Sequence, residues 1–230
     1  MLDKLRGEVL EANLELVRRG LVLYTFGNAS GIARDHGGLV VIKPSGVPYE
    51  TMTPADMVIT DLEGRVVEGK LRPSSDLPTH IALYRAFPSI GGVVHTHSRH
   101  ATAWAQARLE IPCFGTTHAD HFCGSIPVTA PLTPAEIDAD YEANTGVAIV
   151  RLLEGREALG CPAALVAGHG PFCWGKSAMA AAQTAVVVEE LAAMAWQTVT
   201  INPQATPIPA VLRDKHYYRK HGDKAYYGQK

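Results

Sequence analysis

The stretch Gly91-Gly-Val-Val-His-Thr-His-Ser98 joins a short apolar run to two histidines. A second phrase, Leu165-Val-Ala-Gly-His-Gly-Pro171, joins an apolar run to one more histidine. Each run predicts a strand that carries histidine to its end, and side chains two apart on a strand share a face. His95 and His97 can therefore bind one ion, with His169 arriving from a second strand. Three imidazoles with one open position form the ligand set of a catalytic zinc site.

Other segments of the chain follow strand and helix patterns in turn. Strands are expected at residues 38–43, 57–60, 92–97 and 163–167, with a turn near Gly64. Helices are expected from Leu2 to a stop at Gly20, from a cap at residues 74–76 to Phe87, after a capping box at residues 133–136, and over residues 177–198. This interleaving predicts an α/β fold, in which helices cover a sheet.

Length and composition are those of an ordinary globular domain. The chain has 230 residues, of which 47% are hydrophobic and 19% are charged, which suits one domain with a sizeable core. The net charge of −2 argues against bulk nucleic-acid binding, so no nucleic-acid partner is expected. The apolar helix at residues 177–198 contains Gln183, Glu189 and Glu190, which favours a core helix over a membrane span.

Cysteine usage and the N-terminus bear on localisation. No Cys-x-x-Cys pair occurs among Cys113, Cys123, Cys161 and Cys173. No signal peptide precedes the first predicted helix. We therefore expect free thiols in a reducing cytoplasm.

Charge is uneven along the chain. Residues 213–230 hold six Lys or Arg and two Asp, so this tail carries +4 against −6 for the rest. Histidines and tyrosines are interleaved with the tail's charge, and aromatic residues 226–227 lie near a terminus that would normally fray. The tail is either a solvated end, a segment that docks on the chain's own surface, or one that meets an anionic ligand.

Three polar turns are candidates for binding an oxyanion. Lys43-Pro-Ser-Gly46 follows a predicted strand and offers a lysine, a hydroxyl and a closely approachable backbone. Pro73-Ser-Ser-Asp76 opens a predicted helix, whose free N–H groups and dipole favour an anion. Gly27-Asn-Ala-Ser30 is expected to be a third polar loop. Each alone is more often an ordinary turn or cap, but their joint presence beside a metal motif favours phosphate. Asp76 could also ligate the metal or contact a ligating histidine.

The segment Gly170-Pro-Phe-Cys-Trp-Gly-Lys-Ser177 matches the P-loop pattern of nucleotide-binding proteins. A P-loop surrounds phosphate with small residues and backbone N–H groups, whereas Pro171 has no N–H and Phe172 and Trp174 are bulky. We therefore expect no nucleotide hydrolysis. Dinucleotide binding is also disfavoured, because Cys173 occupies the position of the third glycine after Gly168 and Gly170.

The phrase Thr116-Thr-His-Ala-Asp-His121 contains candidate acid/base groups. Asp120 lies among polar residues between two apolar phrases. On sequence alone it is equally a catalytic carboxylate and an ordinary turn aspartate.

Together these phrases resemble the class II aldolase and adducin-like family. The matching words are residues 43–46, 73–76, 95–100, 116–120, 169–171 and 215–222. The similarity runs from Leu10 to the final Lys-Ala-Tyr-Tyr-Gly-Gln, so it covers nearly the whole chain. It implies a single domain over residues 1–230, with a three-layer αβα fold around a largely antiparallel sheet. It also implies a four-fold symmetric homotetramer with active sites between subunits.

The resemblance also implies roles for individual residues. The implied zinc ligands are Asp76, His95, His97 and His169. The implied substrate and phosphate site consists of Gly27, Asn28, Lys43, Ser45, Gly46, Ser74 and Ser75. Asp120 and Tyr227 are the implied acid/base pair, and His216 and Arg219 would approach the site from a neighbouring subunit. On this expectation the tail at residues 213–230 completes the active site of another chain.

Within the family, the resemblance is to the 4-epimerases of pentulose phosphates. It implies a cytoplasmic zinc enzyme that interconverts L-ribulose 5-phosphate and D-xylulose 5-phosphate by breaking and re-forming the C3–C4 bond. A class II sugar-phosphate aldolase is the alternative, but such relatives usually carry glutamate where Asp76 stands. An adducin-like interaction module is the non-enzyme alternative, against which the intact histidine set argues. The pathway, arabinose or ascorbate breakdown among others, and the choice of zinc over manganese or cobalt stay open.

Overall fold

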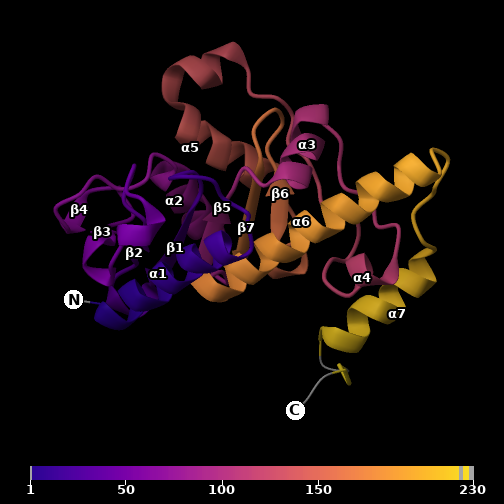
Figure 1. The fold of residues 1–230 in the computed structure, drawn as a ribbon, viewed down its shortest axis with the longest axis horizontal. Coiled ribbons are helices and arrows are strands. Elements are labelled where there is room, and N and C mark those ends of the chain that lie inside the picture. The colour runs from indigo at the N-terminus through magenta and orange to yellow at the C-terminus, as the bar shows by residue number, and fades with distance from the viewer. Residues whose placement is uncertain (1, 223–224, 228–230) are drawn as a thin grey trace.

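The structure, a computed structural model, describes residues 2–222 and 225–227, and this part of the chain forms a seven-stranded sheet covered by helices (Figure 1). The strand order is β4-β3-β2-β1-β5-β7-β6, and all neighbours are antiparallel. The strands are β1 (Asn28–Ala33), β2 (Leu39–Ile42), β3 (Val58–Thr60), β4 (Val66–Glu68), β5 (Gly92–His95), β6 (Ala163–Leu165) and β7 (Pro171–Gly175). The α-helices are α1 (Asp3–Arg18), α2 (Leu77–Ala86), α3 (Arg99–Ala107), α4 (Thr116–Ala119), α5 (Pro134–Leu152), α6 (Ala178–Ile201) and α7 (Ala210–Lys220). Short 3-10 helices lie at Arg34–His36, Tyr49–Thr51, Pro54–Asp56 and Ala158–Gly160.

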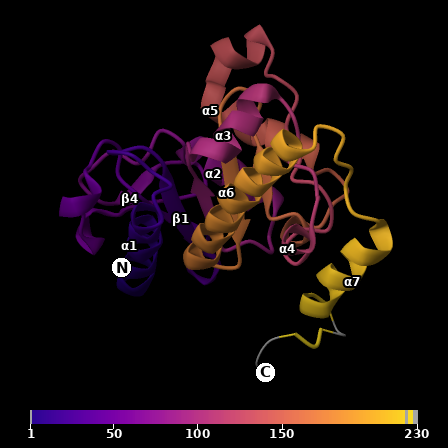
Figure 2. The ribbon, with the colours of Figure 1, turned by 45° about the vertical axis from the view of Figure 1, so that its right-hand side comes forward.

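Alternation of side chains along the strands produces two hydrophobic cores. In β2, Val41 packs in the core that includes α1 and α6, whereas Val40 and Ile42 pack in the core that includes α2 and α5. Val94 and Val93 of β5 divide between the two cores in the same way. Helices α1 and α6 pack side by side on one face, and α2 packs on α5 on the other (Figures 1 and 2). The predicted three-layer fold with a largely antiparallel sheet is confirmed.

Helix α6 is the one helix among the described residues that is long and apolar enough to cross a membrane, by length and composition. Its inner face, which includes Ala181, Ala185, Val188 and Ala192, is buried. This face packs against α1, β5 and β7. The prediction of a core helix is confirmed, although α6 extends to Ile201.

The expected polar loop at residues 27–30 is instead the start of β1, so that prediction is wrong. Every residue of β1 is buried, because α1 packs on one face of the strand and α2 lies against the other. A Cβ at Gly31 would lie 2.9 Å from Leu5 Cδ1 and 3.1 Å from Val9 Cγ2, so glycine lets α1 approach the strand closely. Asn13 of α1 donates to the Ala29 carbonyl and accepts a hydrogen bond from the Ala29 N–H at 2.9 Å. Long-range contacts thus make a strand from a sequence typical of a turn.

The segment that matches the P-loop pattern contains β7, which lies inside the sheet between β5 and β6. Phe172 and Trp174 are fully buried in one core, and Cys173 is buried in the other. The backbone of β7 pairs with both neighbouring strands. This segment is therefore a core strand rather than a phosphate-binding loop, in agreement with the expectation drawn from its bulky residues.

Two element ends near the histidines differ from prediction. β5 ends at His95, so His97 lies in the loop that leads to α3 rather than on the strand. α2 begins at Leu77 with Asp76 at its N-cap, but Asp76 makes no side-chain capping bond. Its carboxylate accepts a hydrogen bond from Asn28 instead. Within the predicted cap at residues 74–76, the Ser74 hydroxyl accepts a hydrogen bond from the Asp76 N–H at 3.4 Å, whereas the Asp76 carboxylate makes no capping bond.

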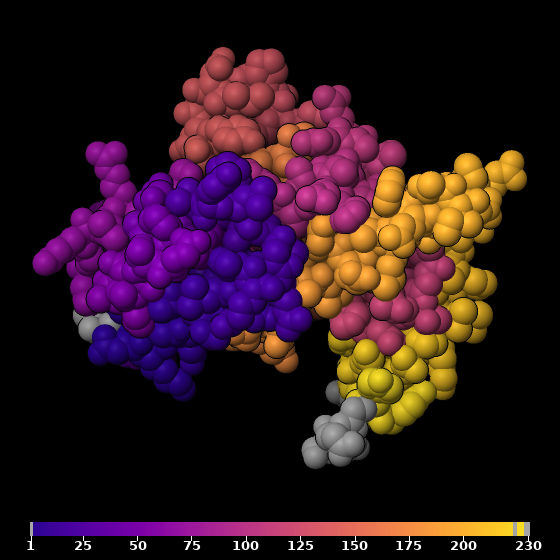
Figure 3. All heavy atoms as spheres, viewed as in Figure 1, coloured from indigo at the N-terminus to yellow at the C-terminus, as the bar shows by residue number. Residues whose placement is uncertain are grey.

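Two parts of the chain project from the body of the molecule. The first turns of α5 form the upper lobe in Figures 1 and 3, and α7 forms the lower right corner. α5 begins with the predicted capping box, in which Thr133 and Glu136 exchange hydrogen bonds. The helix is broken at Asp140, whose φ of −158° and ψ of 92° are not helical.

Candidate metal centre and active site

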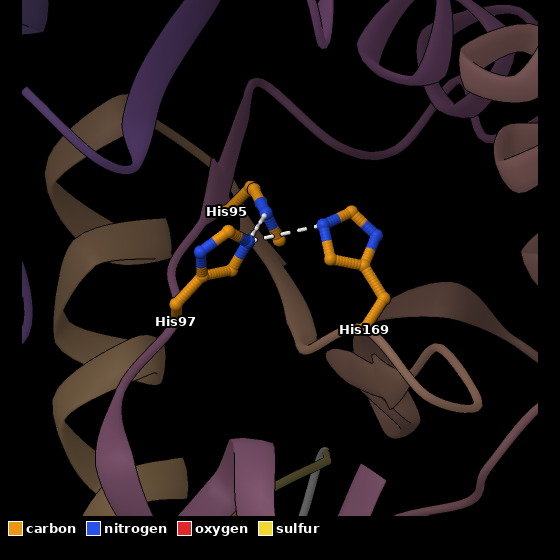
Figure 4. A group of neighbouring side chains, drawn as sticks. All are labelled: His95, His97 and His169. Carbon is orange, nitrogen blue, oxygen red and sulfur yellow. Dashed lines mark hydrogen bonds between the residues drawn. The ribbon is translucent and has the colours of Figure 1, made fainter. Parts of the chain in front are cut away.

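Three histidines converge at the end of β5 (Figure 4). His95 is the last residue of β5, and His169 lies in the connection between β6 and β7. The Nε2 atoms of His95 and His97 lie 3.0 Å apart, and those of His97 and His169 are also 3.0 Å apart. One ligand atom from each ring lies within 4.8 Å of the others. The structure thus brings together the three histidines that the sequence pattern selected.

The opposite ring nitrogens of two histidines have their own partners. The Nδ1–H of His95 donates to the Pro171 carbonyl at 3.0 Å, and the ring stacks on Phe172 with centroids 4.2 Å apart. The Nδ1 of His169 lies 3.1 Å from the Tyr141 hydroxyl. With Nδ1 protonated in each ring, an Nε2 lone pair faces the centre of the cluster.

This donor set fits a divalent cation. Zinc binds imidazole nitrogen at about 2.0–2.1 Å in tetrahedral geometry, which puts two ligand nitrogens roughly 3.3 Å apart. Burial and then the neighbouring imidazoles lower the pKa of His95 well below its ordinary value. Burial, followed by the effect of His97, also lowers the pKa of His169. Neutral imidazole is the form that binds metal, so these rings can hold an ion at neutral pH.

Asp76 lies beside the histidines. Antiparallel pairing places Asn28 of β1 opposite His95 of β5. The Asn28 amide donates to Asp76 Oδ2 at 2.6 Å and to Ser74 Oγ at 3.0 Å. The charge of Asp76 raises the pKa of His169 against the effect of burial, so the carboxylate acts on that ring through space. Among the described residues the metal-binding group does not include Asp76, and its role as a fourth ligand stays a prediction.

The two predicted phosphate-binding segments lie next to each other. Pro44 and Pro73 form an antiparallel bridge, and the Ser74 N–H donates to the Lys43 carbonyl at 2.9 Å. Ser74 is buried by its contact with Asn28. The exposed residues of the two segments include Ser45, Gly46 and Ser75. These residues form a polar surface next to the N-terminus of α2, where an anion is favoured.

Lys43 is buried beneath this surface. Its Nζ donates to the carbonyls of Thr25 and Pro44 and lies 4.8 Å from the centroid of the Tyr49 ring. Burial lowers the pKa of the Lys43 ammonium to about 8. The ammonium supports the turn that leads into β1 through Gly27, whose φ is 72°. Contact between Lys43 and a substrate stays a prediction.

A second polar cluster forms where α4 meets α7. Asp120 accepts hydrogen bonds from His216 Nδ1 at 3.0 Å and from Arg219 at 2.7 and 3.0 Å, and it pairs with Lys220 at 3.3 Å. The ring of Tyr227 lies 4.7 Å from the cations of Arg219 and Lys220. Burial raises the pKa of Asp120, but hydrogen bonds from Arg219, His216 and Lys220 outweigh it and lower that pKa to about 2. The tail thus docks on its own chain.

The two clusters belong to different parts of the fold. The histidines lie at the end of β5, just after it, and just before β7, and Figure 1 labels these two strands near its centre, whereas α4 and α7 lie together at its lower right. Figure 2 shows α4 and α7 in the same relation to each other. Within residues 2–222 and 225–227, no hydrogen bond or ion pair joins the clusters. A single chain therefore does not bring Asp120 or Tyr227 into contact with the histidines.

Residues 7–196 match the sequence profile of the Class II Aldolase and Adducin N-terminal domain. The chain belongs to this family. The match includes all three histidines and α4, which precedes Asp120. It ends within α6, before the tail that carries His216, Arg219 and Tyr227.

Solved structures of similar fold cover most of this class II aldolase domain. An L-fuculose 1-phosphate aldolase superimposes with a TM-score of 0.79 at 24% identity over 94% of this chain and 95% of the other. L-fuculose 1-phosphate aldolase from Glaciozyma antarctica gives 0.78 at 16% identity over 97% and 84%. L-fuculose-1-phosphate aldolase from Thermus thermophilus gives 0.66 at 23% identity over 89% and 98%. At these identities the likeness establishes the fold.

Sequence reasoning missed two neighbours of the histidines in this class II aldolase domain. Tyr141 contacts His169 from α5, and nothing in its local sequence indicates that contact. Glu189 of α6 accepts hydrogen bonds from the N–H groups of His100 and Ala101 and from His100 Nδ1. It therefore caps α3, directly after the loop that holds His97. The signal for Glu189 was its charge within a largely apolar helix, a signal that the neighbouring Glu190 shares.

Proposed function

We propose that the chain is a zinc-dependent 4-epimerase that interconverts L-ribulose 5-phosphate and D-xylulose 5-phosphate. The observation that supports this most is the convergence of three imidazole Nε2 atoms beside a polar surface suited to phosphate. Membership of the class II aldolase family supports chemistry on a sugar phosphate, by a lyase or an epimerase. A cytoplasmic location and a homotetramer belong to the same proposal.

His95, His97 and His169 would hold the divalent cation, with Asp76 as the proposed fourth ligand. A bound cation of this kind supplies Lewis-acid chemistry by polarising a carbonyl oxygen. Zinc is proposed because three neutral imidazoles with an open position are its usual catalytic ligand set, and other divalent metals accept imidazole as well.

The chemistry of inversion at C4 favours bond cleavage. C4 is β to the C2 ketone, so a carbanion at C4 has no resonance partner. Oxidation and re-reduction would use a nicotinamide, and the chain has no G-x-G-x-x-G phrase for one. In the proposed route the C4 hydroxyl loses its proton, the C3–C4 bond breaks, and its electron pair passes to C3, where the ketone delocalises it. The new aldehyde turns over, C3–C4 re-forms on the other face, and the C4 oxygen regains a proton.

The chain's own residues would keep the phosphate in place while the aldehyde turns. The N-terminus of α2 and the adjacent surface lie beside the histidines, so one ligand can reach both. Asn28 links the two regions, because it pairs with His95 through the backbone and donates to Asp76 through its amide. The proposed binding residues are Gly27, Asn28, Lys43, Ser45, Gly46, Ser74 and Ser75.

Inversion also needs proton transfer on two sides of C4, for which we propose Asp120 and Tyr227 of a neighbouring chain. Within one chain Asp120 is a weak base, because its ion pairs lower its pKa to about 2. His216 and Arg219 are donors that also suit a phosphate. If they engage the phosphate of a bound substrate, their hold on Asp120 weakens and it becomes a stronger base. The tail at residues 213–230 would thus complete another subunit's site.

The direct test is incubation of the purified protein with L-ribulose 5-phosphate, with and without a chelator. The expected result is D-xylulose 5-phosphate, lost on chelation and regained on addition of zinc. Failure to form any inverted pentulose phosphate in the zinc-loaded protein would refute the epimerase proposal.

A class II sugar-phosphate aldolase is the second candidate, favoured by the fold shared with L-fuculose 1-phosphate aldolases. It would break the same bond and release both fragments. Measuring free glycolaldehyde phosphate in the same incubation separates the two, because an epimerase retains that fragment and an aldolase lets it accumulate.

A further inference from the structure

Tyr141 contacts a proposed metal ligand from a helix that otherwise does not belong to the site. Its hydroxyl lies 3.1 Å from His169 Nδ1, and the two ring centroids are 5.9 Å apart. The Nε2 of the same imidazole faces His97. A ring that ligates through Nε2 carries its proton on Nδ1, so His169 donates to the Tyr141 oxygen. This contact orients His169 and selects the tautomer that can bind a metal.

The orientation of the His95 ring is fixed in a different way. His95 donates its Nδ1–H to the backbone carbonyl of Pro171, and its ring stacks on Phe172. β5 and β7 fix both contacts through their pairing. His169, in contrast, lies in a turn and is only partly buried. Its orientation therefore depends more on a side-chain partner than that of His95 does.

A break in α5 places Tyr141. Asp140, the preceding residue, has non-helical φ and ψ, and its carboxylate accepts the Ala143 N–H at 3.0 Å. Asp140 thus acts as a cap for the second half of the helix, whose first turn starts at Tyr141. The Thr145 hydroxyl donates to the Tyr141 carbonyl at 2.8 Å, and the Asn144 amide donates to the Glu136 carbonyl at 2.7 Å. These bonds stabilise the break.

The second half of α5 is fixed on α2, the helix whose N-cap is Asp76. Gly146 allows the close approach, since a Cβ there would lie 2.5 Å from Ala82 Cβ. The Thr79 hydroxyl donates to the Glu142 carbonyl, one residue beyond Tyr141. α2 therefore sets the position of both Asp76 and Tyr141 relative to the histidines.

We propose that Tyr141 is a positioning residue of the metal centre, and that the break in α5 at Asp140 is the feature that directs it at His169. The proposal rests on the metal centre described under the proposed function. It adds a side chain whose loss weakens metal binding without removing a ligand. Hydrogen-bond partners of ligating histidines change metal affinity by about 10- to 100-fold when they are removed.

The test measures zinc affinity by competition with a chromophoric chelator, using the full-length chain. Tyr141→Phe removes one oxygen and keeps the ring. Tyr24→Phe, at a highly exposed tyrosine that precedes β1, is the matched control. Asp140→Ala removes the cap at the break, and His97→Asn removes a ligand. Circular dichroism and urea midpoints show whether each variant folds, and the visible spectrum of the cobalt-loaded proteins reports ligand geometry.

Tyr141→Phe is expected to weaken zinc binding by about 10- to 100-fold and to change the cobalt spectrum, with Tyr24→Phe unchanged. Asp140→Ala is expected to act in the same direction. Zinc affinity of Tyr141→Phe equal to wild type would overturn the proposal while the epimerase could still stand. If Tyr141→Phe does not fold, wild-type affinity in Asp140→Ala overturns it. Wild-type affinity in His97→Asn would show that the metal centre itself is wrong, and the proposed function with it.

Discussion

Burial of His118, two residues before Asp120, predicts how the free energy of unfolding depends on pH. Its side chain is almost fully buried, and its Nε2–H donates to the Gly124 carbonyl at 2.8 Å. Burial lowers the pKa of His118 to about 4, with a smaller opposing effect from the Gly124 hydrogen bond. The unfolded chain binds a proton near pH 6.5, and the native chain does so only near pH 4. The stability due to neutral His118 is therefore complete above pH 6.5 and is lost as the pH falls towards 4.

The perturbation is His118→Gln, which keeps an N–H donor for Gly124 and removes the titration. Between pH 7.5 and 5.0, protonation of the unfolded wild-type chain at His118 lowers the free energy of unfolding by about 2 kcal/mol. The glutamine variant lacks this contribution. Carboxylates with ordinary pKa values stay largely ionised over this range, as does Asp120 with its pKa of about 2. Other buried histidines, His80 among them, contribute equally to both proteins and cancel.

The assay is urea unfolding at pH 7.5 and 5.0, followed by tryptophan fluorescence because Trp174 is fully buried. A chelator and a single protein concentration keep metal binding and assembly from contributing. Wild type is expected to lose about 2 kcal/mol more than His118→Gln between the two pH values. Equal losses in the two proteins would refute the account of His118 as a buried neutral imidazole.

Three further outcomes are expected. His97→Asn should abolish stoichiometric zinc, measured by plasma mass spectrometry, and turnover with it; full activity in a metal-free variant would contradict the role of the histidines. Tyr227→Phe should leave the fold and zinc content intact but slow epimerisation by about 10²-fold or more, as for loss of an acid/base group, and an unchanged rate would remove Tyr227 from the mechanism. Gly146→Ala should lower the free energy of unfolding by about 1–3 kcal/mol, because its Cβ would lie 2.5 Å from that of Ala82, and an unchanged urea midpoint would show that α2 and α5 adapt.

Local signals accounted for the elements that the sequence predicted correctly. The run at residues 39–42 forms β2 because its apolar side chains fill cores on both faces of the sheet. The capping box at Thr133 starts α5 where expected, because both of its hydrogen bonds lie within four residues. Such elements are predictable because the contacts that define them are close in sequence or follow a simple period.

The elements that were missed depend on distant residues. β1 has the small and polar sequence of a turn, and it becomes a strand because it pairs with β2 and β5 and Asn13 of α1 binds its backbone. β7 carries a phosphate-loop pattern, yet Trp174 and Phe172 belong to the core. The local pattern of apolar residues indicates neither the strand at β1 nor the burial of β7.

The residues of the candidate site also differ in whether local sequence could predict them. The histidines were predictable because they follow apolar strands and share a ligand chemistry. Tyr141 was not, because its contact with His169 depends on a break in a helix and on how that helix packs against α2. For Asp120, sequence left a turn and a catalytic carboxylate equally open, and in one chain its carboxylate contacts His216, Arg219 and Lys220. Its proposed catalytic role depends on a second chain.

The most direct test of the central claim is an anomalous difference map, recorded at the zinc absorption edge from crystals grown with zinc. The map should show one strong peak per chain about 2.1 Å from the Nε2 atoms of His95, His97 and His169. Full zinc occupancy at another position, with no density among these three rings, would contradict the proposed metal centre and the chemistry built on it.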